Sequence, residues 1–454
     1  MNVLEIAERV LAHLPGEQAQ ATVARERSLV SRFARSRPTQ ATLVDDTGVT
    51  VLVVRDGHTG RAETNDLSEE GLRAVARRAV DAAASAAAAA GEPGDYAGLP
   101  GPRPARAHSG FDLGTAALDP REAGRALQAT FDACAGRGLE AFGIWTAGHV
   151  DTAIASTAGV AVRDAVTDAG MKVVARDDHG RSGWGSGLAV AAGALDPAAI
   201  ARRAAAKVVP GDPAEVTPGE YPVVLAPDAV GGLLEFLGQL AFNGLAHAEG
   251  RGALVGRLGQ RVAASCINLA DTPRFPSTLP RAYDFEGVPK APIPLIQDGV
   301  AHRVVHDTRS AARAGGGERS TGHATAPGGS PWGPHPTNLV LIGGGAADED
   351  ELAAPIEHGL YVTRLWYLNP VHEQSTLMTG TTRDGTFLIE DGRVTRPARD
   401  VRFTDSILRI LEATEALTAT QRLVGDLEFY GRRFATGVVT PALRAQGFRV
   451  TGGA

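Results

Sequence analysis

The stretch 359–397 constrains the fold more than any other part of this sequence. Along residues 360–365, side chains alternate with a period of two and are rich in β-branched and aromatic types, which predicts a β-strand. A second run, residues 386–390, leads into Asp391-Gly392, the commonest two-residue signal for a β-hairpin. A proline ends the pattern, because it has no N–H to give to a ladder. The stretch therefore predicts a sheet with a polar loop, residues 369–375, at its rim, where we expect functional residues.

The order of the predicted elements favours an α+β fold with two domains. At 454 residues, the chain exceeds the size at which one hydrophobic core usually stops growing. Strands occur in meanders with helices beside them, which favours α+β over a doubly wound α/β fold. A connector with several Pro and Gly residues, 211–219, predicts a boundary between residues 1–215 and residues 216–454.

Local signals place several elements. A long helix is expected at residues 69–90, because Ser68 offers an N-cap and acidic residues follow it. Residues 45–48 and residues 182–187, which are rich in Gly with Asp or Ser, predict turns. Residues 314–338 predict a long loop rich in Gly, Ser, Thr and Pro, and a loop of that length is usually functional or disordered.

Composition excludes several classes of protein. The net charge of -7 is small for this length and argues against binding nucleic acid through phosphate contacts. The two cysteines, Cys134 and Cys266, are too few for a disulfide framework, and we expect both to be small buried residues in a reducing compartment. The chain shows no signal-peptide pattern and no run of ~18 apolar residues. We therefore expect a cytoplasmic protein that binds neither nucleic acid nor membrane.

Histidines are the first candidates for a metal site. A zinc hydrolase needs two helical histidines about one turn apart, with a glutamate beside them as base. The sequence contains no His-Glu-x-x-His and no His-Glu-x-x-x-His, and His247 with Glu249 falls beyond the nearest predicted helix. His302 and His306 lie on an apparent strand, where residues four apart are about 13 Å from each other. We expect no metal site made from this chain alone.

A second candidate pair, His372-Glu373, lies in the predicted rim loop. A histidine beside a carboxylate can act as an acid or a base, and a chance surface pair is the competing interpretation. The candidate catalytic residues are therefore His247, Glu249, His372 and Glu373. The residues expected to contact substrate are Asn369, His372 and Asn338.

Several motifs, taken in their order and spacing, resemble the TldD/PmbA family. The opening stretch reads GLYVTRLWYLNPVHEQSTLMTGTTRDGTFLIEDGRVTRP, and similar motifs lie at residues 45–83, 218–237, 256–265, 306–324 and 331–345. The resemblance implies an N-terminal α/β domain with a mixed or antiparallel sheet and long helices, and a C-terminal domain built on antiparallel sheet.

The family has two kinds of subunit. The TldD-like kind holds zinc with a His-Glu-x-x-x-His helix and a cysteine near the C-terminus, while the PmbA-like (TldE) kind lacks these ligands and pairs with it. Here the equivalent helix reads Glu-Phe-Leu-Gly-Gln-Leu at residues 235–240, and the tail has no cysteine. The resemblance therefore implies a zinc-less subunit whose partner is a TldD-like paralogue that carries the zinc, in a heterodimer or a dimer of heterodimers.

The implied activity of that complex is cleavage of peptides, including the maturation of modified peptide natural products, or of a small amide. Two alternatives stay open. The chain could be a stand-alone hydrolase that uses His247, Glu249, His372 or Glu373 in a specialised biosynthetic pathway. It could also be a non-enzymatic regulatory binding protein, as the family's older name, modulator of gyrase, suggests.

Overall fold

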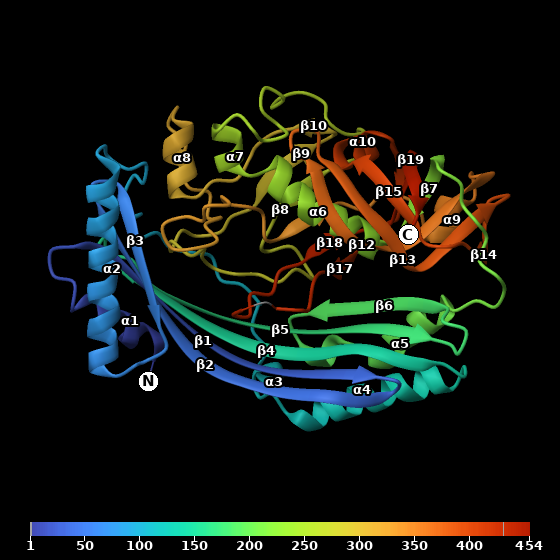
Figure 1. The fold of residues 1–454 in the computed structure, drawn as a ribbon, viewed down its shortest axis with the longest axis horizontal. Coiled ribbons are helices and arrows are strands. Elements are labelled where there is room, and N and C mark those ends of the chain that lie inside the picture. The colour runs from blue at the N-terminus through green and yellow to red at the C-terminus, as the bar shows by residue number, and fades with distance from the viewer. Residues whose placement is uncertain (1, 430) are drawn as a thin grey trace.

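The structure is a computed structural model that describes residues 2–429 and 431–454. Within these residues the strands form three sheets (Figure 1). One sheet belongs to the N-terminal half, and the C-terminal half, with the other two sheets, lies across one face of it. The α+β fold predicted from the sequence is confirmed.

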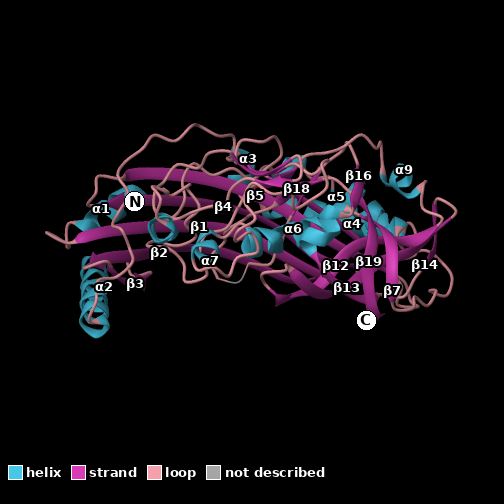
Figure 2. Ribbon diagram, turned by 90° about the horizontal axis from the view of Figure 1, so that it is seen from above, coloured by secondary structure: helices cyan, strands magenta, loops and turns pink. Residues whose placement is uncertain are grey.

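The N-terminal sheet consists of long antiparallel strands in the order β3-β2-β1-β4-β5-β6, which run along the long axis of the molecule (Figure 2). Its strands are β1 (Gln18–Ala34), β2 (Arg37–Arg55), β3 (His58–Thr64), β4 (Glu140–Ser156), β5 (Ala161–Arg176) and β6 (Ser182–Ala189). The helices of this half are α1 (Val3–Leu11), α2 (Glu69–Ala90), α3 (Leu113–Ala116), α4 (Pro120–Ala135), the short η1 (Ala192–Ala194) and α5 (Pro197–Ala206). Helices α4 and α5 pack on the face turned away from the C-terminal half (Figure 1). The opposite face is thus left for the C-terminal half.

The C-terminal half contains one sheet of short strands and one of longer strands. The short strands, in the order β10-β9-β8-β11-β18-β17, are β8 (Leu269–Asp271), β9 (Ile293–Gln297), β10 (Val300–Ala301), β11 (Leu339–Leu341), β17 (Arg422–Val424) and β18 (Val438–Thr440). The longer strands, in the order β12-β7-β19-β15-β13-β14, are β7 (Gly219–Leu225), β12 (His358–His372), β13 (Leu377–Glu390), β14 (Arg393–Pro397), β15 (Val401–Ser406) and β19 (Leu443–Gly453), with β16 (Thr414–Leu417) paired to β19. Because β12 also pairs with β13, this second sheet closes on itself.

Helix α6 (Pro227–Ala241) packs between the two C-terminal sheets. Its apolar side, which includes Leu233, Leu234 and Leu237, is buried in the largest hydrophobic core of the protein. The remaining helices of this half are α7 (Gly244–Ala248), α8 (Thr308–Ala314), α9 (Glu349–Ala353) and α10 (Ile407–Glu412). No helix in the described part of the chain combines the length and the apolar character needed to cross a bilayer.

The two halves are joined by side chains that cross between them. Arg433, from the C-terminal half, donates from Nε to Asp168 on β5 at 2.9 Å, and its backbone N–H donates to Glu26 on β1 at 2.7 Å. Its guanidinium lies over Gly148 of β4, where a Cβ would come within 2.2 Å of the Arg433 Nε atom. A glycine at this position of the strand therefore makes room for the arginine.

Two predicted turns are strands in the structure, and each error has a physical reason. Residues 45–48 lie inside β2. Asp45, which looks like a turn residue in the sequence, accepts two hydrogen bonds from Arg25 of β1, and these satisfy its carboxylate within the strand. The glycines of β6 serve packing, since a Cβ on Gly183 would lie 2.1 Å from a carbonyl oxygen of α5. The predicted rim loop is also shorter than expected: β12 continues to His372 through positions where its register shifts, and only residues 373–376 form the turn.

Candidate functional site

Helix α6 contains residues 235–240, the stretch that the family resemblance implies as the counterpart of the zinc-binding helix. It begins at Pro227, whose fixed φ suits the first helical position, and carries no histidine along its length. Glu235, on the side away from the core, and His335 line a small cavity beside it. A zinc site needs at least three protein ligands, and the described residues contain no group of three His, Cys, Asp or Glu side chains placed to hold a metal ion. The residues at this helix therefore do not fit zinc.

The candidates His247 and Glu249 lie immediately after α6. Asn243 caps the short helix α7 by accepting hydrogen bonds from the backbone N–H groups of residues 245 and 246, and His247 lies within that helix. The Nδ1 atom of His247 is buried and has no hydrogen-bond partner within the described residues. Burial lowers the pKa of His247, so its imidazole is neutral at neutral pH. Glu249 is engaged by arginines, at 2.8 Å from Arg251 and 3.5 Å from Arg313.

The turn between β12 and β13 carries the other candidates and lies against the segment after α7. Arg251, which binds Glu249, also lies 3.3 Å from Glu373, and Gln374 donates to the Gly250 carbonyl at 3.2 Å. The structure thus brings the two candidate carboxylates, which are far apart in the chain, together on one shared arginine. His372 is exposed, and its Nδ1 atom pairs with the Ser375 hydroxyl at 2.9 Å.

The two candidate asparagines lie in different surroundings. Asn369 is exposed on β12, and its amide donates to the Tyr367 carbonyl at 2.8 Å. Asn338 is buried, and its amide donates to Leu279 O at 2.7 Å and to the Thr278 hydroxyl at 3.2 Å. The side chain of Asn338 therefore has its donors committed to the loop before β9, whereas Asn369 is exposed to a ligand or a partner.

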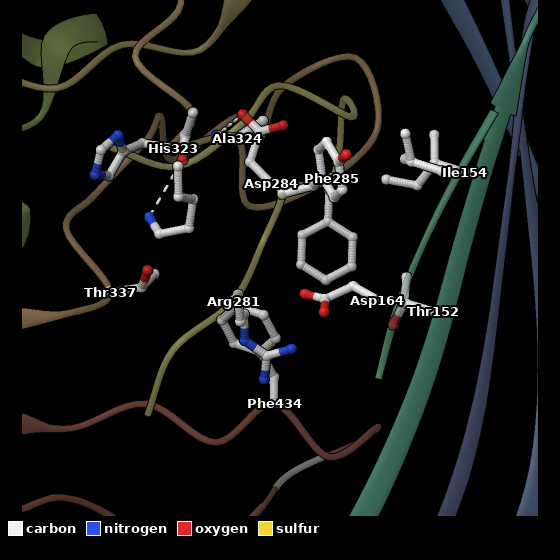
Figure 3. A pocket seen from close by; sticks show the side chains of 14 residues that line it. Thr152, Ile154, Asp164, Arg281, Asp284, Phe285, His323, Ala324, Thr337 and Phe434 are labelled. Atoms are coloured by element: carbon white, nitrogen blue, oxygen red, sulfur yellow. Dashed lines mark hydrogen bonds between the residues drawn. The ribbon is translucent and has the colours of Figure 1, made fainter. Parts of the chain in front are cut away.

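Sequence reasoning missed a buried cluster of ionisable side chains in the C-terminal half, of which His323 is seen in Figure 3. Asp271 accepts hydrogen bonds from the backbone N–H groups of Thr337 and Asn338 and lies 3.9 Å from Lys290 and 3.4 Å from His323. Burial alone would raise the pKa of Asp271, but Lys290 and His323 bring it below its usual range. No single stretch of sequence signals this cluster, because its members come from three separate segments.

Two carboxyl groups of the same region are held by many donors. Asp284 accepts from three backbone N–H groups, including that of Ala324 at 2.9 Å (Figure 3). Glu286 accepts from the backbone and hydroxyl of Thr308 and lies 3.1 Å from the Tyr96 hydroxyl. The cavity beside this cluster has a volume of about 30 Å³, which is room for a few waters and not for a substrate. Of these carboxyl groups, Glu286 joins the two halves, because its partner Tyr96 belongs to the N-terminal half.

The Glu286 carboxyl predicts a measurable pH dependence of stability. Burial, with the nearby Asp284, raises its pKa from 4.5 to about 8. Between these values the folded protein keeps a proton that the unfolded chain releases, so the free energy of unfolding falls as the pH rises through this window. Glu286→Gln, which imitates the protonated carboxyl, is expected to flatten this fall. Thermal unfolding of both proteins between about pH 6.5 and 8.5 checks this.

Glu220→Gln is the control for that experiment, because Glu220 is an exposed partner of Arg449. Exposed ion pairs contribute only about 0–1 kcal/mol, so this variant should keep the slope of the unmodified protein. An unchanged slope in Glu286→Gln would show that Glu286 does not hold a proton in the folded state.

The sequence predicts that both cysteines are buried, which is correct for Cys134 and wrong for Cys266. Cys134 is buried in α4, as expected, but Cys266 is exposed, because β8 begins only at Leu269 and leaves the cysteine in the turn before it. Neither cysteine is in a disulfide.

Comparisons with known proteins agree on one family. The model of the PmbA/TldA metallopeptidase C-terminal domain matches residues 218–452, and models of domain 1 and of the central domain match residues 19–83 and 116–209. A metalloprotease from Methanothermobacter thermautotrophicus is 25% identical over 236 residues, covering 52% of this chain and 51% of that protein. A zinc metalloprotease TldD homolog from Saccharolobus solfataricus is 25% identical over 211 residues, covering 44% of each chain. The matched part thus spans about half the length of these curated relatives or less.

Solved structures share the whole fold. TldE from Thermococcus kodakarensis superimposes with a TM-score of 0.85 at 19% identity, covering 99% of both chains. A putative modulator of a DNA gyrase from Thermotoga maritima gives a TM-score of 0.83 at 20% identity, covering 98% of this chain and 99% of that one. Together with the family models, which account for most of the sequence, these similarities lead to one conclusion: the chain belongs to the PmbA/TldD metallopeptidase family.

Proposed function

We propose that this chain is the zinc-less, TldE-type subunit of a two-component peptidase or amidase, and that a TldD-like paralogue supplies the zinc. The observation that carries the proposal is helix α6, which contains the stretch that the resemblance implies as the counterpart of the zinc-binding helix and which offers one glutamate and no histidine. The cysteines support it as well, since Cys134 is buried in the N-terminal half and Cys266 precedes β8, so neither is in the C-terminal tail. Two unpaired cysteines also favour a reducing, cytoplasmic location.

The surface around the outer side of α6 supports a partner. Leu368 of β12 would contact a Cβ on Gly232 of α6 at 3.3 Å, and Pro336 of the Gly-rich loop would contact one on Gly238 at 3.5 Å. Both elements flank the helix and carry exposed aromatic side chains: Tyr367 is 77% exposed and Trp332 is 84% exposed. In the proposed complex, these exposed side chains are the apolar surface beside α6 that the partner would cover.

In this proposal the chain's own residues shape a cleft and present the substrate. The turn between β12 and β13 and the loop of residues 315–334 would face the shared cleft, with Asn369 and His372 available to hydrogen-bond a peptide. The zinc of the partner would supply the activated water, and no catalytic step is assigned to this chain.

The test is reconstitution with a zinc-bearing TldD-like paralogue from the same genome. We expect the two chains to elute together on size exclusion, and the complex, but not this chain alone, to hydrolyse a peptide library. The proposal fails if the lone chain hydrolyses peptides as fast as the mixture does.

One observation favours the alternative of a stand-alone hydrolase: His247 is held neutral, as a general base must be, and lies near Glu249. His247→Ala and His372→Ala would each abolish the turnover of the lone chain in that case. A gyrase-type regulatory role, which the name of the Thermotoga relative suggests for that protein, predicts instead that co-purification recovers a non-peptidase partner.

A further inference from the structure

An open groove with a volume of about 1100 Å³ lies between β6 of the N-terminal sheet and β17 of the C-terminal half. Its walls come from β6 and the segment after it, from α5, from the loop of residues 273–280, and from β17. β6 and β17 are each the last strand of their sheet (Figure 1). The groove is therefore bounded by two sheet edges and is large enough for an extended peptide.

Four arginines line this groove: Arg106, Arg203, Arg274 and Arg422. Arg422 lies 3.3 Å from the carboxylate of Asp228. Within residues 2–429 and 431–454, the other three form no ion pair with a carboxylate; Arg203 donates to Ser186 O at 2.7 Å, and Arg274 donates to backbone carbonyls. Asp196 and Asp228 act on the charge of Arg203, and Asp164 on that of Arg274, from beyond ion-pair distance, so these guanidinium charges are only partly offset.

The acidic residues of the groove offset this charge only in part. Asp196, which also lines it, accepts a hydrogen bond from the backbone of Ala199 at 2.8 Å as the cap of α5 and lies 3.8 Å from Arg202. A cluster of positive charges on a protein whose net charge is -7 creates a local field that attracts anionic groups. Guanidinium groups suit carboxylates in particular, because the planar fork can donate two parallel hydrogen bonds.

The edge of β6 also offers backbone hydrogen-bonding groups to a peptide in the groove. Ser186 O accepts from Arg203 at 2.7 Å and from Arg422 at 3.0 Å, so this carbonyl points away from β5. In an antiparallel ladder, alternate residues turn their N–H and C=O to the same side, so Leu188 presents its backbone groups to the groove as well. An edge of this kind pairs readily with an added strand.

We infer that this groove binds an extended acidic peptide, which adds as a strand beside Leu188 of β6 and places its carboxylates on Arg106, Arg203 and Arg274. The inference rests on the proposed function for the class of ligand, because a peptidase complex needs a place where its substrate is held. The proposed function does not specify the charge of the substrate, whereas this groove would select an acidic peptide.

Fluorescence anisotropy of the full-length chain, without any partner, tests this. The probe is a labelled peptide of sequence Glu-Thr-Glu-Val-Glu-Thr-Glu-Val, and its comparison peptide has Gln at every Glu. We expect the acidic peptide to bind about tenfold more tightly at low salt and to lose this advantage as salt is added. In an added strand, only every second backbone N–H of the peptide would face the edge of β6. N-methylation of the odd-numbered residues and N-methylation of the even-numbered residues should therefore weaken binding to very different extents. Equal affinity for the Glu and Gln peptides would overturn the inference.

Two variants with the same change in charge locate the site. Arg106→Glu/Arg203→Glu should abolish the preference for the acidic peptide, whereas Arg73→Glu/Arg77→Glu, on the exposed side of α2, should retain most of it. Equal losses in both would show that only the net charge matters and would contradict the inference. Because hydrolysis is not measured, a failure of the proposed zinc-dependent complex leaves this result unaffected, and peptide selection can fail while the complex remains active.

Discussion

Arg433→Ala is expected to lower the free energy of unfolding by about 3–5 kcal/mol, because it leaves a buried carboxylate without its partner. The Arg433 side chain is 1% exposed and the Asp168 side chain is 3% exposed. The guanidinium also donates to the Thr146 hydroxyl at 2.9 Å, so its removal leaves several polar groups of the sheet unsatisfied. Urea unfolding followed by circular dichroism measures the loss.

The neighbouring Arg432 provides a matched control. Its side chain is 39% exposed, donates to Ala24 O at 2.9 Å and lies 3.8 Å from Asp46, an exposed carboxylate. Arg432→Ala should therefore cost only about 1–2 kcal/mol, less than Arg433→Ala. If both variants lose the same stability, the halves of the protein are not joined through the Arg433–Asp168 pair.

Asp271→Ala is the second change with a large expected effect, again about 3–5 kcal/mol. It removes the acceptor of two buried backbone N–H groups, at 2.7 and 3.0 Å, and the counter-charge of Lys290. Asp81→Ala, on the exposed side of α2, should change the stability by less than about 0.5 kcal/mol. The same urea unfolding experiment measures both variants.

A double variant separates the charge from the hydrogen bonds. Because an uncompensated buried ammonium is the larger cost, Asp271→Ala/Lys290→Met should be more stable than Asp271→Ala alone. If Lys290→Met lowers the stability of Asp271→Ala by as much as it lowers the stability of the unmodified protein, the two side chains do not stabilise each other.

The sequence predicts those elements whose signals are local. Helix α2 begins and ends where expected, because the Ser68 side chain accepts a hydrogen bond from Gly71 N and Gly91 adopts a left-handed conformation after it. The turn between β13 and β14 lies at Asp391-Gly392, both with positive φ, as the hairpin signal requires.

Errors arise where distant packing decides the structure. The glycines of β6 look like a turn in the sequence, but they are small because α5 crosses the strand closely, and nothing nearby in the chain reports that contact. Likewise Asp45 looks like a turn residue until Arg27 of β1 is placed opposite it. Such strands can be recognised only once the partner elements are known.

The candidate site shows the same contrast between local signals and contacts of distant segments. His247, Glu249 and Glu373 could be named from short motifs, but their meeting at Arg251 depends on the fold of the whole C-terminal half. The cluster at Asp271, Lys290 and His323 gave no signal at all, because its residues are far apart in the chain. The groove beside β6 was missed for the same reason, since its arginines come from both halves.

The zinc content of the purified chain tests the central claim most directly. The chain is expressed alone and together with its TldD-like paralogue, equilibrated with zinc, dialysed, and measured by atomic absorption. The account predicts no stoichiometric zinc in the lone chain and one tightly held ion for each paralogue subunit in the complex. One tightly held zinc ion in the lone chain, together with peptide hydrolysis, would contradict it.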